Sequence, residues 1–401
     1  MGTIRASALA RPQFKSNPHP FYARMRVERP VFPVSIPFFG RGWLVTRYED
    51  VVTVAKDDRF SRDVLSKVRW LPGFVVVPFT RHMLAQDPPD HTRLRKLVSQ
   101  AFTPGRIERL RARVQAVSHE LLDAAPRTGS FDLIKGYAHP IPFTVIAELL
   151  GIPNEDRPRF HKLVQRSLPI SAPAGILDIP RSLPYVWMIT RYFRRLFAER
   201  RAHPGDDLLS ALVQAEEAGD RLDEDELLGM AILLLVAGYE TTVHLIGSAA
   251  LALIQHPEQR ARFVGEPDLA SSAIEELVRY TSPVEMTLPR VLREDVTLAS
   301  VTIPRGDWVS GVLTSANRDE SVFQNPDTLD LGRDPNPHLA FGKGRHFCLG
   351  SSLARMEAQV ALTTLFTRVP GLRLTQPAES LRWRSLVPIR GLVELPVAGR
   401  V

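Results

Sequence analysis

The sequence contains a single cysteine, Cys348, among 401 residues. One thiol cannot form an internal disulfide, so nothing in the composition points to an oxidising compartment. Residues 1–14 also lack the continuous apolar segment of a secretory signal or a membrane anchor. We therefore expect a cytoplasmic protein without a membrane span.

Repeats and low-complexity tracts are missing as well. The 33 prolines form short clusters, and none of these clusters is a long flexible linker. We expect residues 1–401 to form one large domain, with residues 1–20 as a loosely ordered N-terminal segment. No fused flavin or ferredoxin segment is recognisable, so any electron donor is expected to be a separate protein.

Charge of one sign is only modestly in excess. The chain has 51 Lys and Arg against 44 Asp and Glu, a formal charge of +7, and the basic residues are interleaved with acidic and apolar ones. The densest basic run, residues 191–204, is typical of an amphipathic helix with a solvated face. This pattern argues against nucleic acid and favours an acidic protein as a partner.

Hydrophobic periodicity predicts a mainly α protein with small β-sheets. Helical spacing extends over residues 106–125, 223–255 and 353–369. Residues 42–57 combine a strand with a following helix, and residues 301–313 alternate like a strand around a turn.

The helix at 223–255 is apolar on every side from Leu227 to Gly238, a run of roughly a dozen residues, whereas a membrane span needs about 20. Such a helix belongs in the centre of a large protein. Polar residues then interrupt it at Glu240, Thr241 and His244. They could form a local i,i+4 pair of Glu240 with His244, or they could serve catalysis, and spacing alone leaves both open.

The cysteine lies in the segment HLAFGKGRHFCLGSSLAR, residues 338–355. A lone cysteine is usually a small buried apolar side chain. A catalytic thiol beside His346 is a second interpretation, but no oxyanion hole or third group accompanies it. A metal ligand is the third, because the helix expected to begin near Gly350 points its positive end at the sulfur and favours thiolate. No second ligand stands at zinc spacing.

Phe341, Gly344, Cys348 and Gly350 match the F-x-x-G-x-x-x-C-x-G pattern of the cytochrome P450 family, and the chain resembles its soluble bacterial members. Four further segments resemble family motifs in family order. They are the oxygen-binding motif AGYETT (237–242), the haem-contacting helix (87–102), the E-x-x-R segment (275–280) and the segment leading to the cysteine (316–342).

The resemblance implies a cytochrome P450 fold, with haem between the long central helix and the helix after the cysteine loop. It implies haem b (iron protoporphyrin IX) ligated by Cys348, with dioxygen as co-substrate. It also implies that Thr241 donates a hydrogen bond to the oxygen being reduced and that Glu240 relays protons. The other expected cofactor-binding residues are His91, Arg95, Arg290 and His346 for the propionates, and Ala237, Gly238, Phe341, Gly344 and Gly350.

The resemblance further implies a buried structural network of Glu276, Arg279 and Arg333 that supports the cysteine loop. Substrate contacts are expected in the uncharged segment 70–79 and at a few positions elsewhere, and they indicate an apolar substrate. The candidates are Trp70, Leu71, Phe74, Phe79, Leu234, Met286, Leu288 and Val387.

The activity implied is that of a monooxygenase that hydroxylates or epoxidises an apolar molecule. An acidic ferredoxin-type donor and its reductase are the expected partners, attracted by Lys343, Arg345, Arg93 and Lys96. A peroxide-driven peroxygenase is an alternative that the Glu240 and Thr241 pair disfavours. A non-enzymatic haem sensor or electron-transfer protein is the alternative from another class.

Overall fold

The computed structural model describes residues 3–36, 40–62, 80–100, 102–126, 129–167, 178–217 and 222–400. The chain divides into two compact units. The first comprises Met1–Ser61, Arg111–Ile141 and Thr241–Val401, and the second comprises Arg62–Leu110 and Pro142–Glu240. The long helices α7 (Pro104–Asp123) and α12 (Glu224–Gln255) contribute residues to both.

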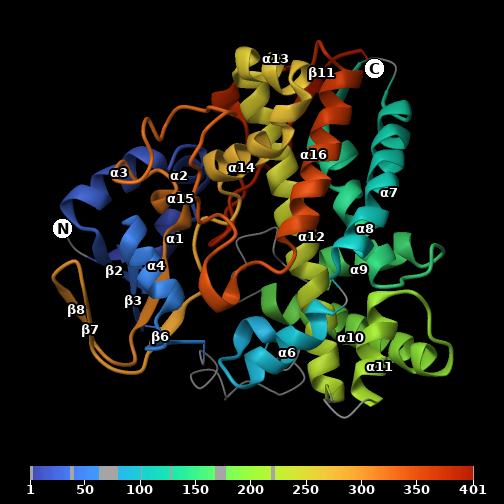
Figure 1. The fold of residues 1–401 in the computed structure, drawn as a ribbon, viewed down its shortest axis with the longest axis horizontal. Coiled ribbons are helices and arrows are strands. Elements are labelled where there is room, and N and C mark those ends of the chain that lie inside the picture. Colours follow the sequence, from blue (N-terminus) through green and yellow to red (C-terminus); the bar gives the residue numbers. More distant parts are fainter. Residues whose placement is uncertain are drawn as a thin grey trace. The chain divides into compact units, whose positions relative to one another are not determined.

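A six-stranded sheet in the first unit has the order β1-β2-β3-β9-β6-β4. Figure 1 labels its strands β2, β3 and β6. Strands β3 and β9 pair in parallel, with Gly42 opposite Trp308, so the sheet joins segments far apart in the sequence. Its strands are β1 (Ile4–Arg5), β2 (Val31–Ile36), β3 (Gly40–Val45), β4 (Phe60–Ser61), β6 (Arg290–Leu292) and β9 (Trp308–Gly311).

Helix α4 (Tyr48–Lys56) packs onto this sheet through an apolar stripe. Val51 and Val54 lie three residues apart, which places them on one face of the helix, and both are fully buried. They share a hydrophobic cluster with Val45 of β3 and Val309 of β9. Apolar spacing in the sequence thus fixes where α4 lies.

The other elements of the first unit include two small sheets, β10-β11-β5 and β7-β8. Their strands are β5 (Ser130–Asp132), β7 (Val296–Leu298), β8 (Val301–Ile303), β10 (Arg373–Leu374) and β11 (Pro396–Ala398). The helices are α1 (Ala6–Leu9), α2 (Pro12–Ser16), α3 (His19–Glu28), α13 (Pro257–Gly265), α14 (Ala270–Thr281), α15 (Leu313–Ala316) and α16 (Ser351–Arg368).

The second unit is helical in its described residues. Its helices are α6 (Asp90–Ser99), α9 (Arg157–Ser167), α10 (Asp178–Ala202) and α11 (Leu208–Glu217), together with the larger part of α8 (Pro140–Leu149). Gly238 allows α12 to approach α8 closely, since a Cβ at this position would lie 3.1 Å from the Cδ1 atom of Ile146.

The main predictions from periodicity are confirmed. Residues 42–57 contain most of β3 and all of α4, residues 301–313 contain β8 and β9, and the three predicted helices correspond to α7, α12 and α16. Helix α12 is long and apolar enough to cross a membrane by length and composition, but 72% of the relevant window is buried inside the structure, as in the core helix of a soluble protein.

A buried ion cluster fixes the N-terminal segment to the rest of the first unit. Lys15 of α2 pairs with Glu285, and both side chains are fully buried. Burial lowers the pKa of Lys15 and raises that of Glu285, and the attraction between them opposes both changes. Arg390 donates from Nε to the Lys15 carbonyl at 2.8 Å, and its guanidinium lies 4.0 Å from the Trp383 ring centroid.

Candidate active site

The loop that carries Cys348 is shaped by its own backbone. The Cys348 N–H donates to the Phe341 carbonyl at 2.9 Å, and a short 3-10 turn covers Gly344–His346. Gly342 and Gly344 adopt φ values of +73° and +74°, a region that other residues rarely occupy. A Cβ on Gly344 would also lie 3.1 Å from the Ala55 carbonyl oxygen. Gly342 and Gly344 are therefore required by the turn, whereas Gly350, with φ of −83° and nothing within 4 Å of an added Cβ, is not.

The cysteine precedes a helix, as the sequence predicts. Helix α16 begins at Ser351 with Gly350 as its N-cap, and the Ser351 N–H donates to the Cys348 carbonyl at 3.4 Å. The Cys348 side chain is exposed, and the neighbouring Phe347 is 40% exposed. Among the described residues no group of three or more His, Cys, Asp or Glu could hold a metal ion. Any metal here would depend on the single sulfur.

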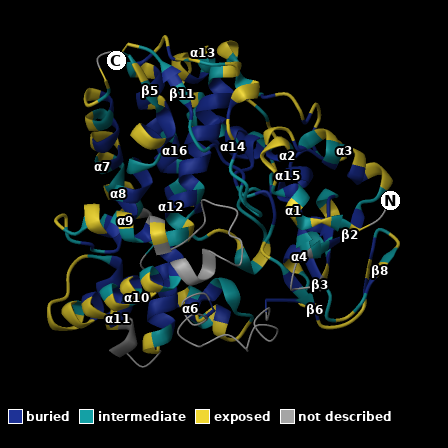
Figure 2. Cartoon of the chain, turned by 180° about the vertical axis from the view of Figure 1, so that it is seen from behind, coloured by how far each residue is buried: buried dark blue, intermediate teal, exposed yellow. Residues whose placement is uncertain are grey.

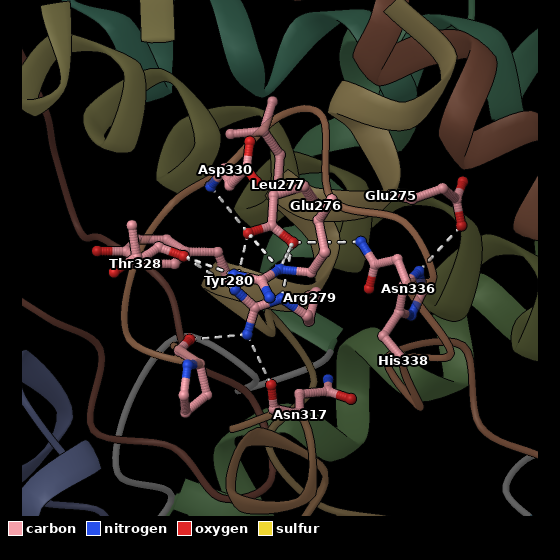
Figure 3. A network of polar contacts seen from close by, with 12 residues as sticks. Glu275, Glu276, Leu277, Arg279, Tyr280, Asn317, Thr328, Asp330, Asn336 and His338 are labelled. Atoms are coloured by element: carbon pink, nitrogen blue, oxygen red, sulfur yellow. Dashed lines mark hydrogen bonds and ion pairs between the residues drawn. The ribbon is translucent and has the colours of Figure 1, made fainter. Parts of the chain in front are cut away.

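An ion pair on α14 lies at the centre of the polar network of Figure 3. Glu276 and Arg279 are fully buried, and Arg279 donates to both carboxylate oxygens at 2.7 Å, from Nε and from Nη2. The same guanidinium donates to the carbonyls of Asn317 and Pro326 at 2.8 Å. The pair therefore ties α14 to the chain that leads into the cysteine loop.

Arg333 completes this network. Its Nε donates to Glu276 at 3.1 and 3.2 Å, and its Nη1 donates to the Gln324 carbonyl at 2.7 Å. Asn336 donates to the same carboxylate at 3.2 Å, and the Asp330 N–H does so at 3.0 Å. A buried carboxylate with this many donors is fully compensated.

The structure adds a second network that the sequence analysis did not identify. Glu275 accepts from Arg355 Nη2 at 2.8 Å and contacts His338 Nε2 at 2.9 Å (Figure 3 shows the His338 contact). The Arg355 guanidinium lies 4.3 Å from the ring centroid of Phe341 in the cysteine loop. Burial opposes ionisation of Glu275, but the hydrogen bonds and charges of Arg355 and His338 lower its pKa to about 2. The only sequence signal was the doublet Glu275-Glu276.

Helix α12 is buried along most of its length but is exposed around Ala237 and Thr241, a stretch that we call the opening of α12. Residues 226–235 and 242–253 are all buried, whereas Ala237 is exposed and Thr241 is partly exposed. These two residues are one helical turn apart and share a face. A small side chain and a hydroxyl thus line the open side of an otherwise buried helix.

The polar residues beside this opening differ in their surroundings. Glu240 is 8% exposed and Thr242 is 2% exposed. His244 is 1% exposed and packs on Gly391, where an added Cβ would overlap the imidazole. Glycine at position 391 is therefore needed to seat His244.

The four expected propionate ligands belong to both units. His91, 3% exposed, and the partly exposed Arg95 lie on α6 of the second unit. Arg290, 4% exposed, and the partly exposed His346 belong to the first. Arg290 donates from Nη1 to the Phe60 carbonyl and from Nη2 to the Ala55 carbonyl, both at 3.2 Å, which fixes the orientation of its guanidinium.

The expected substrate contacts fall into three groups. Trp70, Leu71, Phe74 and Phe79 lie outside the described residues. Met286 is 3% exposed in a cluster that includes Leu9 and Met25, and Val387 packs against the same cluster. Leu234 is also buried, whereas Leu288 is 39% exposed. Leu288 is therefore the described candidate with the most surface open to a ligand.

Glu357 on α16 is a buried carboxyl that the sequence analysis did not mention. It is 1% exposed, and its Oε2 atom has no hydrogen-bond partner among the described residues. Burial raises the pKa of Glu357 to about 8, so the group is mainly neutral at neutral pH. The helix after the cysteine loop thus contains a carboxyl without adding a charge to the core.

Comparison with known proteins identifies the family. The family model described as cytochrome P450 matches residues 41–370. The polyketide biosynthesis cytochrome P450 PksS of Bacillus subtilis (strain 168) is 41% identical over 395 residues, 96% of either chain. A solved structure of PksS from Bacillus subtilis 168 has a TM-score of 0.90 at 40% identity and covers 97% of this chain and 98% of its own. The chain belongs to the cytochrome P450 family.

Two further solved structures are similar over nearly the whole chain. Myxobacterial CYP267B1 in complex with myristic acid has a TM-score of 0.90 at 41% identity and covers 98% of this chain and 99% of its own. P450BioI in complex with an acyl carrier protein ligated to hexadec-9Z-enoic acid has a TM-score of 0.87 at 39% identity and covers 96% and 99%. The protein is thus an oxidoreductase of the monooxygenase type, with the cytochrome P450 fold.

Members of this family hold haem through a cysteine thiolate, and the residues described above fit such a group. The only thiol is exposed at the start of α16. Apolar side chains that usually lie inside a protein, Leu288 and Phe347, are 39% and 40% exposed. The strongly buried Arg290 supplies positive charge of the kind that carboxylates require, and the strongly buried His91 supplies an imidazole that can form a hydrogen bond.

Proposed function

We propose that this protein is a cytoplasmic haem-thiolate monooxygenase that hydroxylates or epoxidises an apolar substrate. The observation that carries the proposal is the opening of α12 at Ala237 and Thr241, in a helix that is otherwise buried. The haem would supply the redox chemistry, since thiolate-ligated iron activates dioxygen. Overall, one oxygen atom enters the substrate, and the other leaves as water after uptake of two electrons and two protons.

The residues of this chain would hold the cofactor and deliver protons. Cys348 would be the iron ligand, held by its hydrogen bond to Phe341. His91, Arg95, Arg290 and His346 would bind the propionates as charge-assisted partners. Thr241 would donate a hydrogen bond on the open side of α12, and Glu240 would hold a proton for transfer toward it.

The substrate that we propose is a long acyl chain or a related polyketide-type molecule, either free or linked to a carrier protein. The support comes from relatives whose names or bound molecules are of this kind: a polyketide biosynthesis enzyme, a complex with myristic acid and a complex with an acylated carrier protein. The exposed Leu288 is an apolar contact for such a chain.

The reaction can be tested with myristic acid as the probe. The haem-loaded protein, a ferredoxin and its reductase should incorporate label from isotopically labelled dioxygen into the product. Incorporation of label from hydrogen peroxide alone would favour the peroxygenase. Failure of the reduced protein to consume dioxygen with any acyl probe would favour a sensor or an electron-transfer protein.

Thr241→Ala should retain binding of haem and myristic acid but lose coupling. With one positioned donor removed, product formed per electron pair should fall on the order of a hundredfold, while peroxide appears instead. The measurement is product and peroxide yield per reduced nicotinamide consumed. Thr242→Val, a change at the adjacent buried position, is the matched control and should remain coupled. A fully coupled Thr241→Ala enzyme would refute the assignment.

The electron donor that we propose is an acidic ferredoxin-type protein, but the structure narrows the surface expected for it. Arg345 is paired with Asp58, and Arg93 contacts Glu226 at 3.2 Å, so these charges are partly compensated. Lys343 of the cysteine loop has no ion pair with any described residue. Among Lys343, Arg345 and Arg93, it is the cation without an ion pair to a described residue, so its charge is open to a partner.

Lys343→Glu should slow reduction by an acidic ferredoxin by about tenfold at low ionic strength, because electrostatic steering is lost. The difference should shrink as salt shortens the screening length below about 8 Å. Stopped-flow reduction under carbon monoxide measures the rate. Arg373→Glu is the matched control, since Arg373 is exposed beyond the far end of α16, a helix about 27 Å long. Salt-independent reduction, equal in both variants, would place docking elsewhere.

A further inference from the structure

Helices α9 and α10 form an antiparallel pair in the second unit. Phe160 on α9 lies 4.9 Å from the ring of Tyr192 on α10, and further along α9 the Arg166 guanidinium lies 5.7 Å from the ring of Tyr185. From the first contact to the second, the residue number rises on α9 and falls on α10, so the two helices are antiparallel. These two contacts hold the helices side by side.

The apolar side of each helix is buried. On α10, Val186, Ile189, Phe193 and Phe197 repeat at intervals of three or four residues, and each is at most 6% exposed. The opposite side is exposed (Figure 2 shows exposed residues along α10). We call this side the basic face, and its exposed charged and large apolar residues are Arg159, Lys162, Arg166, Trp187, Met188, Arg191, Arg194, Arg195 and Glu199.

Six of the seven charged residues of the basic face are cations, and the one acid, Glu199, accepts from Arg200 Nη1 at 2.9 Å. Arg194 approaches Glu224 and Asp225 at 3.9 and 3.8 Å. The other five cations form no ion pair with any described residue, although Arg191 lies 5.5 Å from the Trp187 ring centroid. Five uncompensated positive charges on adjacent helices repel one another. Their repulsion would be relieved by an acidic surface placed against them.

Two large apolar side chains are exposed on this face. Trp187 is 55% exposed and Met188 is 39% exposed. Aromatic residues, Met and Arg are enriched in protein interfaces, where a few of them supply most of the binding energy. A helix that lies on a lipid surface presents a broad apolar side, whereas the broad apolar side of α10 faces the protein interior. The composition therefore favours a protein partner over a membrane.

We propose that the basic face docks an acidic carrier protein that presents the acyl substrate. Acidic side chains on its helices would pair with Arg191, Arg195 and Lys162, and an apolar residue would pack on Trp187. This inference rests on the proposed function, because it assumes an acyl substrate. It assigns a role to the basic run that the sequence alone marked as a solvated helix face.

The test uses the haem-loaded full chain and two probes: acyl carrier protein loaded with a hexadec-9Z-enoyl chain, and free hexadec-9Z-enoic acid. The double variant Arg191→Glu/Arg195→Glu should bind the loaded carrier at least tenfold more weakly at low salt and bind the free acid as wild type does. Trp187→Ala should weaken carrier binding by about tenfold with little change in its salt dependence. Calorimetry measures the affinity of each of these proteins for each probe.

Arg109→Glu is the matched control, because Arg109 is an exposed cation of the same unit on α7. It should bind the loaded carrier as wild type does. Equal carrier binding by the double variant and the control would overturn the proposal. Absence of carrier binding by the wild-type protein would also overturn it. Salt-sensitive binding to phosphatidylglycerol vesicles through these arginines, without carrier binding, would overturn it in favour of a membrane. Carrier binding through the face without any oxygenated product would support the docking surface and overturn only the acyl substrate.

Discussion

Replacing Cys348 with serine is expected to abolish the red-shifted Soret band that thiolate ligation gives the reduced carbon-monoxide complex. Serine keeps the shape of the side chain and the backbone hydrogen bond to Phe341 but removes the sulfur, and no other cysteine exists to replace it. A neutral hydroxyl does not supply the electron density of a thiolate. The same variant should also lose monooxygenase turnover, down to the background rate.

The measurement is a reduced carbon-monoxide difference spectrum, read beside the haem content of the same sample. Ser352→Ala is the matched control, since it changes an exposed residue in the first turn of α16 and leaves the sulfur in place. It should give the wild-type band. A wild-type band from Cys348→Ser would show that Cys348 is not the iron ligand and would refute the assignment of the site.

Glu276→Gln is expected to lower the free energy of unfolding by about 3–5 kcal/mol. The substitution keeps the shape of the side chain but leaves Arg279 as a buried charge without its counter-ion, which is a costly state. It also weakens the contacts from Arg333 and Asn336. Because these residues lead into the cysteine loop, the yield of haem-loaded protein should fall as well.

Urea denaturation of matched samples measures the effect. Glu28→Gln is the control, because Glu28 pairs with Arg24 at 3.9 Å while both side chains are about half exposed. Exposed pairs of this kind contribute at most about 1 kcal/mol. The pair Glu276→Leu/Arg279→Met, which removes both charges, should recover part of the lost stability. A Glu276→Gln protein as stable as the Glu28→Gln control would show that the network does not support the fold.

The cysteine loop and the central helix could be predicted well because their signals are local. Gly342 and Gly344 adopt positive φ angles, which glycine tolerates and other residue types rarely do. Whether a residue type tolerates such an angle depends on that residue alone. The all-round apolar pattern of α12 identified a core helix, and its interruption at Glu240 and Thr241 coincides with the opening beside Ala237. Such features depend on neighbours within a few positions.

By itself the sequence determined which segments are helices, which helix is buried and where the single thiol stands relative to a helix start. Only the tertiary structure decided which charges meet. Glu275 pairs with Arg355, which stands 80 positions later in the sequence, and Lys15 pairs with Glu285, which stands 270 positions later. Arg345, one of the four cations expected to attract the electron donor, is paired with Asp58. Periodicity reports which face of a helix is apolar, but long charged side chains take partners from whichever segment the folded chain brings within their reach.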